Sequence, residues 1–266
     1  MKVFISADIE GVAGITDWSE ASKSSNEYSY FAEQMTKEVK AACNGANRAG
    51  ADEIWIRDAH GSGRNIDASE LPENTKLIRG WSGHPFGMVQ ELDKTFDAVI
   101  YIGYHAWGGS NYSPLAHTIN DSRVDNIKIN GEYASEFLLN SYAAAYVEVP
   151  VVFISGDKGI CEHAKNINEN IKTVAVSEGV GNSTISIHPD LAIELIEEGV
   201  EESLKGDLSK NKITLPEGFN LEMSYVAQGI AYESSFYPGA KLIGPKKVKF
   251  YSKDYFEILR ARMFLV

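Results

Sequence analysis

The stretch Val3–Gly14 reads VFISADIEGVAG, an apolar run that ends in two carboxylates, Asp8 and Glu10. The run Lys2–Ala7 predicts a buried β-strand, and side chains two positions apart along a strand point to the same side. Asp8 and Glu10 should therefore bring their charges into one small volume where the strand ends. Two carboxylates this close repel each other, so one takes up a proton unless a cation lies between them. A turn with two solvated acids is the simpler alternative.

Predicted strands and helices alternate along the chain beyond this stretch. A helix over Asn26–Ala51 is followed by strand-like segments at Asp52–Gly61, Phe96–Ala106 and Val149–Gly159. Such alternation is typical of an α/β protein with a mostly parallel sheet that helices cover on both faces. We expect residues 1–205 to form this α/β core and residues 206–266 a smaller α+β extension packed on it, unless the whole chain is one domain. The segment NIKINGEY, residues 126–133, predicts a hairpin that turns at Asn130 and Gly131.

The composition limits the partners that the chain can bind. The 266 residues carry a formal net charge of −12, which disfavours nucleic acid because phosphate binding needs a basic surface. No apolar run approaches the roughly 18 residues of a membrane span, and the start MKVFISADIE lacks the apolar core of a signal peptide. The two cysteines, Cys43 and Cys161, have no second cysteine nearby, so neither a zinc knuckle nor a disulfide framework is expected. We expect a soluble cytoplasmic protein.

Side chains with metal-binding chemistry follow several predicted strands at their carboxyl ends. In a parallel sheet these ends meet at one edge, where ligands bind. The residues at the strand ends are Asp8, Glu10, Asp58, His60, His105 and Asp157. A single histidine in such a place is more often a hydrogen-bonded structural residue, but several ligand-type residues at one edge favour a metal site. Imidazole suits zinc and similar transition metals, whereas magnesium sites use oxygen ligands almost alone.

A centre with two metal ions would account for both the carboxylates and the imidazoles. Such centres hold their ions about 3.5–4 Å apart and need a bridging carboxylate, and Asp8, innermost on the first strand, is the natural bridge. The predicted helix ASEFLLNSYAAAY, residues 134–146, offers Glu136 as a further carboxylate on the same face as Asn140. A solvent-facing Glu136 is the alternative.

Four further histidines differ in the role that their surroundings suggest. His117 lies beyond a Gly/Ser/Asn-rich loop, and its imidazole has the chemistry of a proton shuttle near neutral pH. His84 is also loop-borne, and its proline and glycine neighbours make a role in a turn equally plausible. His163 and His188 fall on predicted helix surfaces or starts, so we expect both to be structural.

Six short segments occur in a specific order and spacing along the first part of the chain. They are SADIEG (6–11), DAHG (58–61), GYHA (103–106), AHTI (116–119), SEFLLNSYAA (135–144) and VPVVFISGD (149–157). Together they resemble the D-aminopeptidase family of dinuclear zinc metallopeptidases. The resemblance runs from residue 1 to about residue 160.

The resemblance implies two zinc ions per chain and assigns roles to six residues. The family's metal ligands fall on Asp8, Glu10, His60, His105 and Glu136, and its catalytic histidine falls on His117. Members of the family hydrolyse short peptides with an N-terminal D-amino acid and form ring-shaped homo-oligomers. The segments WGGSNYSPL (107–115) and RGWSGHPFG (79–87), the latter with His84, depart from the family's usual sequence, and we expect both to border the substrate.

We therefore expect a zinc metallo-aminopeptidase in which two metal ions activate water and His117 passes a proton to the leaving amine. Two other functions are open. In the first, a magnesium-dependent phosphohydrolase of the haloacid dehalogenase type would use Asp8 as nucleophile and Asp157 on the metal, although that pattern has no need for the two strand-end histidines. In the second, the protein binds metal without catalysis, and side chains fill every coordination position.

Overall fold

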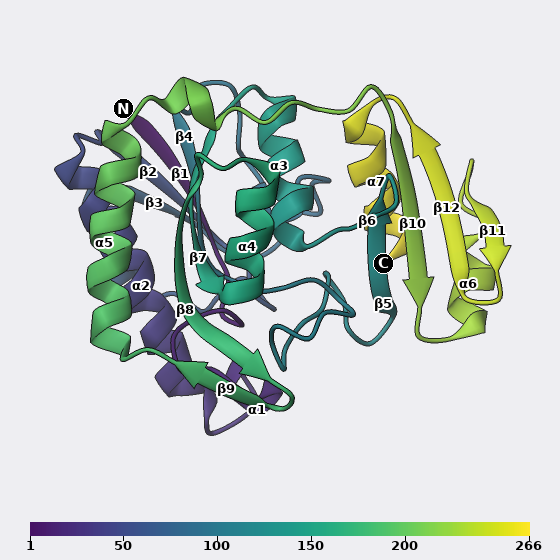
Figure 1. Ribbon diagram of the computed structural model, residues 1–266, viewed down its shortest axis with the longest axis horizontal. Coiled ribbons are helices and arrows are strands. Elements are labelled where there is room, and N and C mark those ends of the chain that lie inside the picture. The colour runs from purple at the N-terminus through teal and green to yellow at the C-terminus, as the bar shows by residue number, and fades with distance from the viewer.

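The computed structural model covers residues 1–266 and contains two β-sheets with helices packed around them (Figure 1). β1 (Lys2–Ala7) lies inside the larger sheet, sheet A, between β2 (Glu53–Asp58) and β4 (Ala98–Tyr104), and it pairs in parallel with both. The outer strands are β3 (Thr75–Ile78), β7 (Val151–Asp157), β8 (Lys172–Val180) and β9 (Ser183–Ser186). The order is β3-β2-β1-β4-β7-β8-β9, and only β8 and β9 pair antiparallel. The mostly parallel sheet confirms the predicted fold class.

Alternating side chains of β1 explain why sheet A carries helices on both faces. Val3 and Ile5 belong to one apolar cluster, and Phe4 between them belongs to another. The first cluster includes residues of α2 (Tyr28–Arg48) and α5 (Pro189–Lys205), and the second includes residues of α3 (Glu136–Tyr146) and α4 (Lys158–Ile167). Figure 1 shows these two pairs of helices on opposite sides of the sheet. Both faces of β1 are therefore buried, as its continuous apolar run predicts.

The smaller sheet, sheet B, is antiparallel and draws on two distant parts of the chain. Its order is β11-β12-β10-β5-β6. Its strands are β5 (Val124–Ile129), β6 (Glu132–Tyr133), β10 (Phe219–Tyr225), β11 (Lys241–Gly244) and β12 (Lys247–Ser252). The predicted hairpin joins β5 to β6 through Asn130 and Gly131, which have positive φ angles of 54° and 92°. Because sheet B combines residues 124–133 with residues 219–252, the division of the chain at residue 206 stays a prediction.

Helix α7 (Tyr255–Leu265) lies between α3 and sheet B (Figure 1). The Tyr255 hydroxyl donates a hydrogen bond to the Leu139 carbonyl of α3 at 2.7 Å, and the Tyr225 hydroxyl of β10 donates to the Leu265 carbonyl at 3.0 Å. The remaining elements are α1 (Trp18–Ala21), α6 (Gln228–Ser234) and 3₁₀ helices at Ala68–Glu70, Gly87–Val89 and Leu208–Asn211. None of the helices combines the length and the apolar character that crossing a membrane would require.

The contact between α2 and α5 depends on a glycine. A Cβ atom added to Gly45 would lie 2.3 Å from the Glu197 carbonyl oxygen of α5, which is backbone and cannot rotate away. We expect Gly45→Ala to push the two helices apart and to lower the free energy of unfolding by about 1–3 kcal/mol, measured by urea denaturation. Gly229→Ala in α6 is the control, because a Cβ there meets no atom within 4 Å. Equal stability of the two variants would contradict this account of the packing.

Candidate metal centre

The carboxyl ends of β1, β2 and β4 bring the predicted ligands to one edge of sheet A. Asp8 follows β1 directly, His105 follows β4 directly, and His60 comes two residues after β2. The Asp8 amide donates to the Ile102 carbonyl at 2.8 Å, and the Gly11 amide donates to the Gly103 carbonyl at 2.9 Å. These bonds tie the Asp8 segment to the end of β4, so the backbones that carry the two ligands are held in one arrangement.

Glycine is required where these two segments meet. A Cβ atom on Gly11 would lie 1.9 Å from the Tyr104 carbonyl oxygen, and one on Gly103 would lie 2.3 Å from the Asp8 carbonyl oxygen. Gly103 also has a φ of +67°, a conformation that L-residues rarely adopt. The close approach of the two backbones sets how near the side chains of Asp8 and His105 can come.

Asp8, Glu10 and His60 form a first group of potential metal ligands, with ligand atoms that all lie within 4.8 Å of one another. His60 Nδ1 lies 3.3 Å from Asp8 Oδ1 and 3.0 Å from Glu10 Oε2. Both carboxylates are buried, with exposed fractions of 2% and 3%. The two acids therefore do point into one volume, as the strand pattern predicted.

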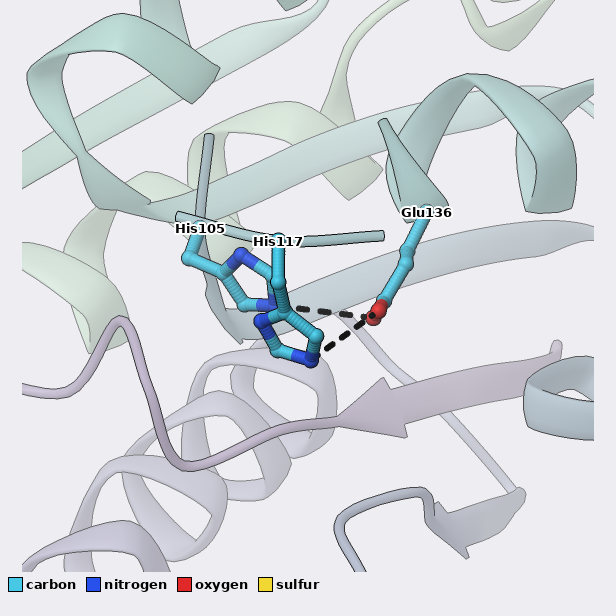
Figure 2. Close-up of side chains that lie close together, drawn as sticks. All are labelled: His105, His117 and Glu136. Atoms are coloured by element: carbon cyan, nitrogen blue, oxygen red, sulfur yellow. Dashed lines mark ion pairs between the residues drawn. The ribbon is translucent and has the colours of Figure 1, made fainter. Parts of the chain in front are cut away.

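His105, His117 and Glu136 form a second such group (Figure 2). Glu136 is the first residue of α3, and its carboxylate oxygens lie 3.6 Å from His105 Nε2 and 3.6 Å from His117 Nε2. The two imidazole rings stack with centroids 4.3 Å apart and an angle of 8° between their planes. The second oxygen of Asp8, Oδ2, lies 3.7 Å from His105 Nε2. Asp8 thus lies between the two groups.

Each of the three histidines uses one ring nitrogen on a backbone carbonyl and leaves the other facing carboxylates. His60 Nε2 lies 2.8 Å from the Ala21 carbonyl oxygen, His105 Nδ1 lies 2.9 Å from that of Ala106, and His117 Nδ1 lies 3.0 Å from that of Leu115. In a neutral imidazole, an N–H that donates to a carbonyl leaves the lone pair on the other nitrogen, where it can bind a metal ion. This arrangement is typical of histidines that bind metal.

The electrostatics of the two groups favour positive charge between the carboxylates. Burial and the neighbouring Glu10 raise the pKa of Asp8 well above its usual value. Burial opposes charge on Glu136 too, but His105 lowers its pKa to about 2, and the same contact raises the pKa of His105 to about 10 against the effect of burial. His60 has a raised pKa because its attraction to Glu10 and Asp8 outweighs burial.

Two buried atoms in the groups have no hydrogen-bond partner, namely Glu10 Oε2 and His105 Nε2. A buried polar atom without a partner destabilises the folded protein. A coordinate bond from each of these two atoms to a cation would remove that cost. Carboxylate oxygens and imidazole nitrogens are also the donors that zinc accepts in proteins. The residues present therefore fit a divalent transition metal.

The two remaining strand-end carboxylates, those of Asp58 and Asp157, accept hydrogen bonds from backbone amides instead. Asp58 accepts hydrogen bonds from the amides of Asn65 and Ile66, the latter at 2.9 Å, and so shapes the loop after His60. Asp157 caps α4 by accepting from the Ile160 amide at 2.8 Å, and it accepts from the Ala106 amide, next to His105, at 2.6 Å. Burial raises the pKa of Asp157 to about 6. Neither carboxylate belongs to a ligand group.

The other histidines lie outside the two groups. His84 is exposed in its loop, where Nδ1 accepts from the Phe86 amide at 3.2 Å, as expected of a residue in a turn. His163 lies 3.2 Å from the Ser135 hydroxyl, and burial lowers its pKa to about 4. His188 is the N-cap of α5. Asn140, on the same helix as Glu136, donates to the Tyr104 hydroxyl at 3.1 Å.

All members of the two groups except His105 line a pocket of about 500 Å³. Its lining also includes Trp18, Trp81, Met88, Ile119, Asp121 and Arg262. The Trp18 ring packs edge-on against His117 with centroids 5.1 Å apart. Trp81 donates from Nε1 to the Gly61 carbonyl at 2.7 Å and lies 4.1 Å from the guanidinium of Arg57.

Sequence reasoning missed Trp18 and Arg262 as pocket residues. Trp18 could have been found, because it follows β1 at the same sheet edge as the ligands. Arg262 had no such signal, since α7 reaches the pocket through tertiary packing alone. The segment that contains Trp81 does border the pocket, but His84 from that segment does not line it.

An open α/β sheet whose strand ends bring acidic and histidine side chains together at one edge is typical of metal-dependent enzymes. The chain belongs to the D-aminopeptidase family, peptidase family M55, whose sequence pattern matches residues 1–264. This match confirms the resemblance and extends it over the last hundred residues. It makes the protein an enzyme of a peptidase family and disfavours the phosphohydrolase and the non-catalytic alternatives.

Two known proteins are similar over nearly the full length. The D-aminopeptidase of Bacillus subtilis (strain 168) is 28% identical over 265 residues, which cover 99% of this chain and 96% of that protein. The solved structure described as "Zn-dependent D-aminopeptidase DppA from Bacillus subtilis, a self-compartmentalizing protease" superimposes with a TM-score of 0.92 at 27% identity. That superposition covers 100% of this chain and 96% of the other.

A buried carboxyl group supports the loop that follows the first ligand group. Glu38 of α2 accepts hydrogen bonds from the Ala13 amide at 2.8 Å and from Gln34 Nε2 at 3.0 Å. Burial raises its pKa from 4.5 to about 7. The folded protein therefore holds the Glu38 proton more tightly than the unfolded chain does.

This shift predicts a pH-dependent loss of stability. The contribution of Glu38 to the free energy of unfolding is complete below about pH 4.5 and disappears as the pH rises through 7. The reason is that the pKa of Glu38 is higher in the folded protein than in the unfolded chain. Between these limits the wild type should lose up to about 3 kcal/mol of unfolding free energy relative to Glu38→Gln, measured by urea denaturation at several pH values. Glu33→Gln, on the exposed side of the same helix, is the control. Parallel pH curves for wild type and Glu38→Gln would refute the prediction.

Proposed function

We propose that this protein is an aminopeptidase that hydrolyses short peptides with an N-terminal D-amino acid and holds two zinc ions in its pocket. The observation that carries the proposal is the position of Asp8, with one oxygen facing His60 and the other facing His105. A carboxylate shared between two ligand groups is the bridge that two-metal hydrolases need. Membership of the D-aminopeptidase family and the zinc dependence of the similar solved structure support the same function.

Five residues would hold the ions. Asp8, Glu10 and His60 would bind one, and Asp8, His105 and Glu136 would bind the other. Mixed carboxylate and imidazole donors favour zinc over magnesium. When bound, the ions would supply Lewis-acid chemistry, which activates water and polarises the scissile carbonyl.

His117 would move the proton in this reaction. Its Nδ1 is held by the Leu115 carbonyl, so Nε2 faces the pocket, 3.6 Å from Glu136 Oε1. A neutral Nε2 would accept a proton as the nucleophile forms and deliver it to the leaving amine. Trp18 packs edge-on against the ring. The position of His117 within the second ligand group also makes it the alternative ligand there, which metal analysis can decide.

We also propose that copies of the chain assemble into a ring-shaped homo-oligomer in the cytoplasm. The similar solved structure is described as self-compartmentalizing. In this chain Tyr232 and Phe236 of the α6 region and Phe264 of α7 are 61%, 70% and 63% exposed. Exposed aromatic side chains on one part of a protein are typical of surfaces that another chain covers.

The activity can be tested with two dipeptides. We expect zinc-loaded protein to release amine from D-Ala-D-Ala and not from L-Ala-L-Ala, and we expect chelator-stripped protein to regain this activity with zinc but not with magnesium. p-Nitrophenyl phosphate is the control substrate for the phosphohydrolase alternative. Cleavage of the phosphate ester alone, or of neither dipeptide under any metal, would overturn the proposed function.

The roles of the histidines can be separated by measuring turnover and zinc content together. His117→Ala should lower kcat by about 100- to 10,000-fold while two zinc ions per chain remain. His60→Asn should lose zinc as well as activity, because its Nδ1 faces two carboxylates. His188→Asn is the control, since asparagine can also cap α5. Loss of zinc from His117→Ala would make His117 a ligand rather than a proton carrier.

A further inference from the structure

Arg262 brings a buried guanidinium group into the pocket of the candidate metal centre. Its exposed fraction is 6%, and it lines the same pocket as Asp8, Glu10 and Glu136. It comes from α7, more than a hundred residues beyond the last proposed ligand. A basic group among acidic ligands calls for a specific explanation.

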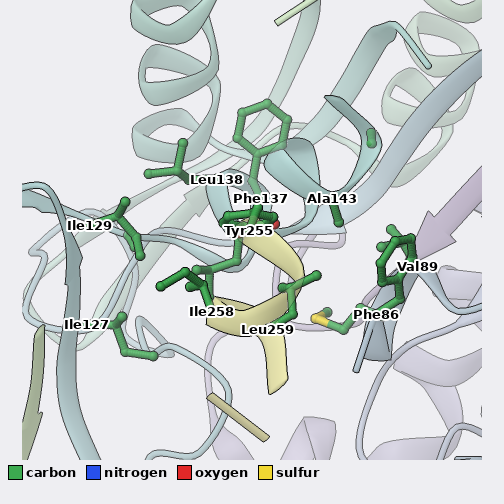
Figure 3. Packing of buried hydrophobic residues seen from close by; sticks show 14 of the residues in the cluster. Phe86, Val89, Ile127, Ile129, Phe137, Leu138, Ala143, Tyr255, Ile258 and Leu259 are labelled. Carbon is green, nitrogen blue, oxygen red and sulfur yellow. The ribbon is translucent and has the colours of Figure 1, made fainter. Parts of the chain in front are cut away.

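The packing of α7 fixes where Arg262 points. Tyr255, Ile258 and Leu259 of this helix are buried in the apolar cluster that also contains Phe137 and Leu138 of α3 (Figure 3). Arg262 lies four residues after Ile258 and three after Leu259, which places it on the same face of the helix. The apolar residues therefore anchor the helix, and Arg262 extends its buried face into the pocket.

The hydrogen-bonding capacity of Arg262 is mostly unused. A guanidinium carries five N–H donors, and Nη2 of Arg262 donates to the Pro85 carbonyl at 2.9 Å. The site's carboxylates interact with histidines, and Arg262 forms an ion pair with none of them. The other nitrogens of Arg262 are not among the buried atoms that lack a partner, so their N–H donors are open to the pocket. A guanidinium with free donors and no carboxylate partner can bind an anion.

Gly87 makes room for this guanidinium. Gly87 has a φ of +54°, and a Cβ added to it would lie 3.0 Å from Nη2 of Arg262. The backbone at Pro85 and Gly87 thus lies against the Nη2 side of the guanidinium. The arrangement holds the side chain without covering its remaining donors.

We propose that Arg262 binds the C-terminal carboxylate of the peptide substrate. The inference rests on the proposed aminopeptidase function and adds to it a contact for the other end of the substrate. A guanidinium matches a carboxylate with two parallel hydrogen bonds. Arg262 lines the same pocket as Asp8, Glu10 and Glu136, so a peptide held at the proposed metal ligands can place its carboxyl end at the guanidinium. The preferred substrates would therefore carry a free C-terminal carboxylate.

A purely structural role is the rival explanation, since Arg262 also ties α7 to the Pro85 carbonyl. The two roles differ in what they do to different substrates. A structural tie affects the whole pocket and changes the cleavage of all peptides alike. A carboxylate contact affects only those peptides that carry the charge.

The test compares D-Ala-D-Ala with its C-terminal amide. Wild-type, zinc-loaded protein should favour the free acid in kcat/KM by about 10- to 100-fold. Arg262→Gln should bring this ratio close to one by slowing cleavage of the acid, and Arg262→Lys should retain part of the preference. Arg260→Gln is the matched control, because Arg260 lies on the exposed side of the same helix and pairs with Glu257. The wild-type comparison requires no variant, so it holds even if Arg262→Gln does not fold.

Binding measurements separate this inference from the proposed function. The affinities of both dipeptides for zinc-loaded His117→Ala, with and without Arg262→Gln, can be measured by calorimetry without turnover. Tighter binding of the free acid that disappears in Arg262→Gln would support the carboxylate contact even if the wild type proved not to be a peptidase. Equal affinity for the acid and the amide would overturn the inference, and so would an equal loss of affinity for the two peptides in Arg262→Gln. Either result would leave the peptidase function standing.

Discussion

Repulsion among buried carboxylates is the constraint on which the rest of the structure depends. Asp8, Glu10 and Glu136 are each at most 3% exposed and share one pocket. Like charges held so closely would separate if their backbones could move. The fold prevents this movement by placing Asp8 after β1, which is flanked by strands on both sides, and by packing glycine against the end of β4. Buried carboxyl groups behind the site, such as Asp157 and Glu38, hold the adjoining loops by accepting backbone amides.

Much of this arrangement could be predicted because it follows from periodicity and topology. The apolar runs and the helices between them indicate a parallel sheet, and a parallel sheet places strand ends at one edge. This placement predicts Asp8, His60 and His105 as ligands. Glu136 is predicted because a carboxylate in an apolar helix needs a partner. His117 was preferred over His84 only through the resemblance to a family, since both lie in loops with no regular period.

The remainder depends on tertiary contacts that leave no local mark in the sequence. The hairpin at Asn130 and Gly131 was evident, but its antiparallel pairing with β10, about ninety residues later, was not. The antiparallel strand β9 was missed because its four residues show little apolar alternation. The same holds for Arg262, which enters the pocket because α7 packs between α3 and sheet B. Local patterns specify elements, whereas the docking of α7 is decided by how well distant apolar faces fit.

The origin of the proposed ligands on separate elements of the fold has a consequence for folding. Apart from Asp8 and Glu10, these residues are dozens of positions apart in the sequence, so the unfolded chain does not hold the complete donor set together. The complete donor set exists only after β1 has paired with both of its neighbours. Any ion that it binds therefore lowers the free energy of the native state alone, and the gain grows with the logarithm of the free metal concentration. The melting temperature of the protein would then rise with the concentration of free metal in the surroundings.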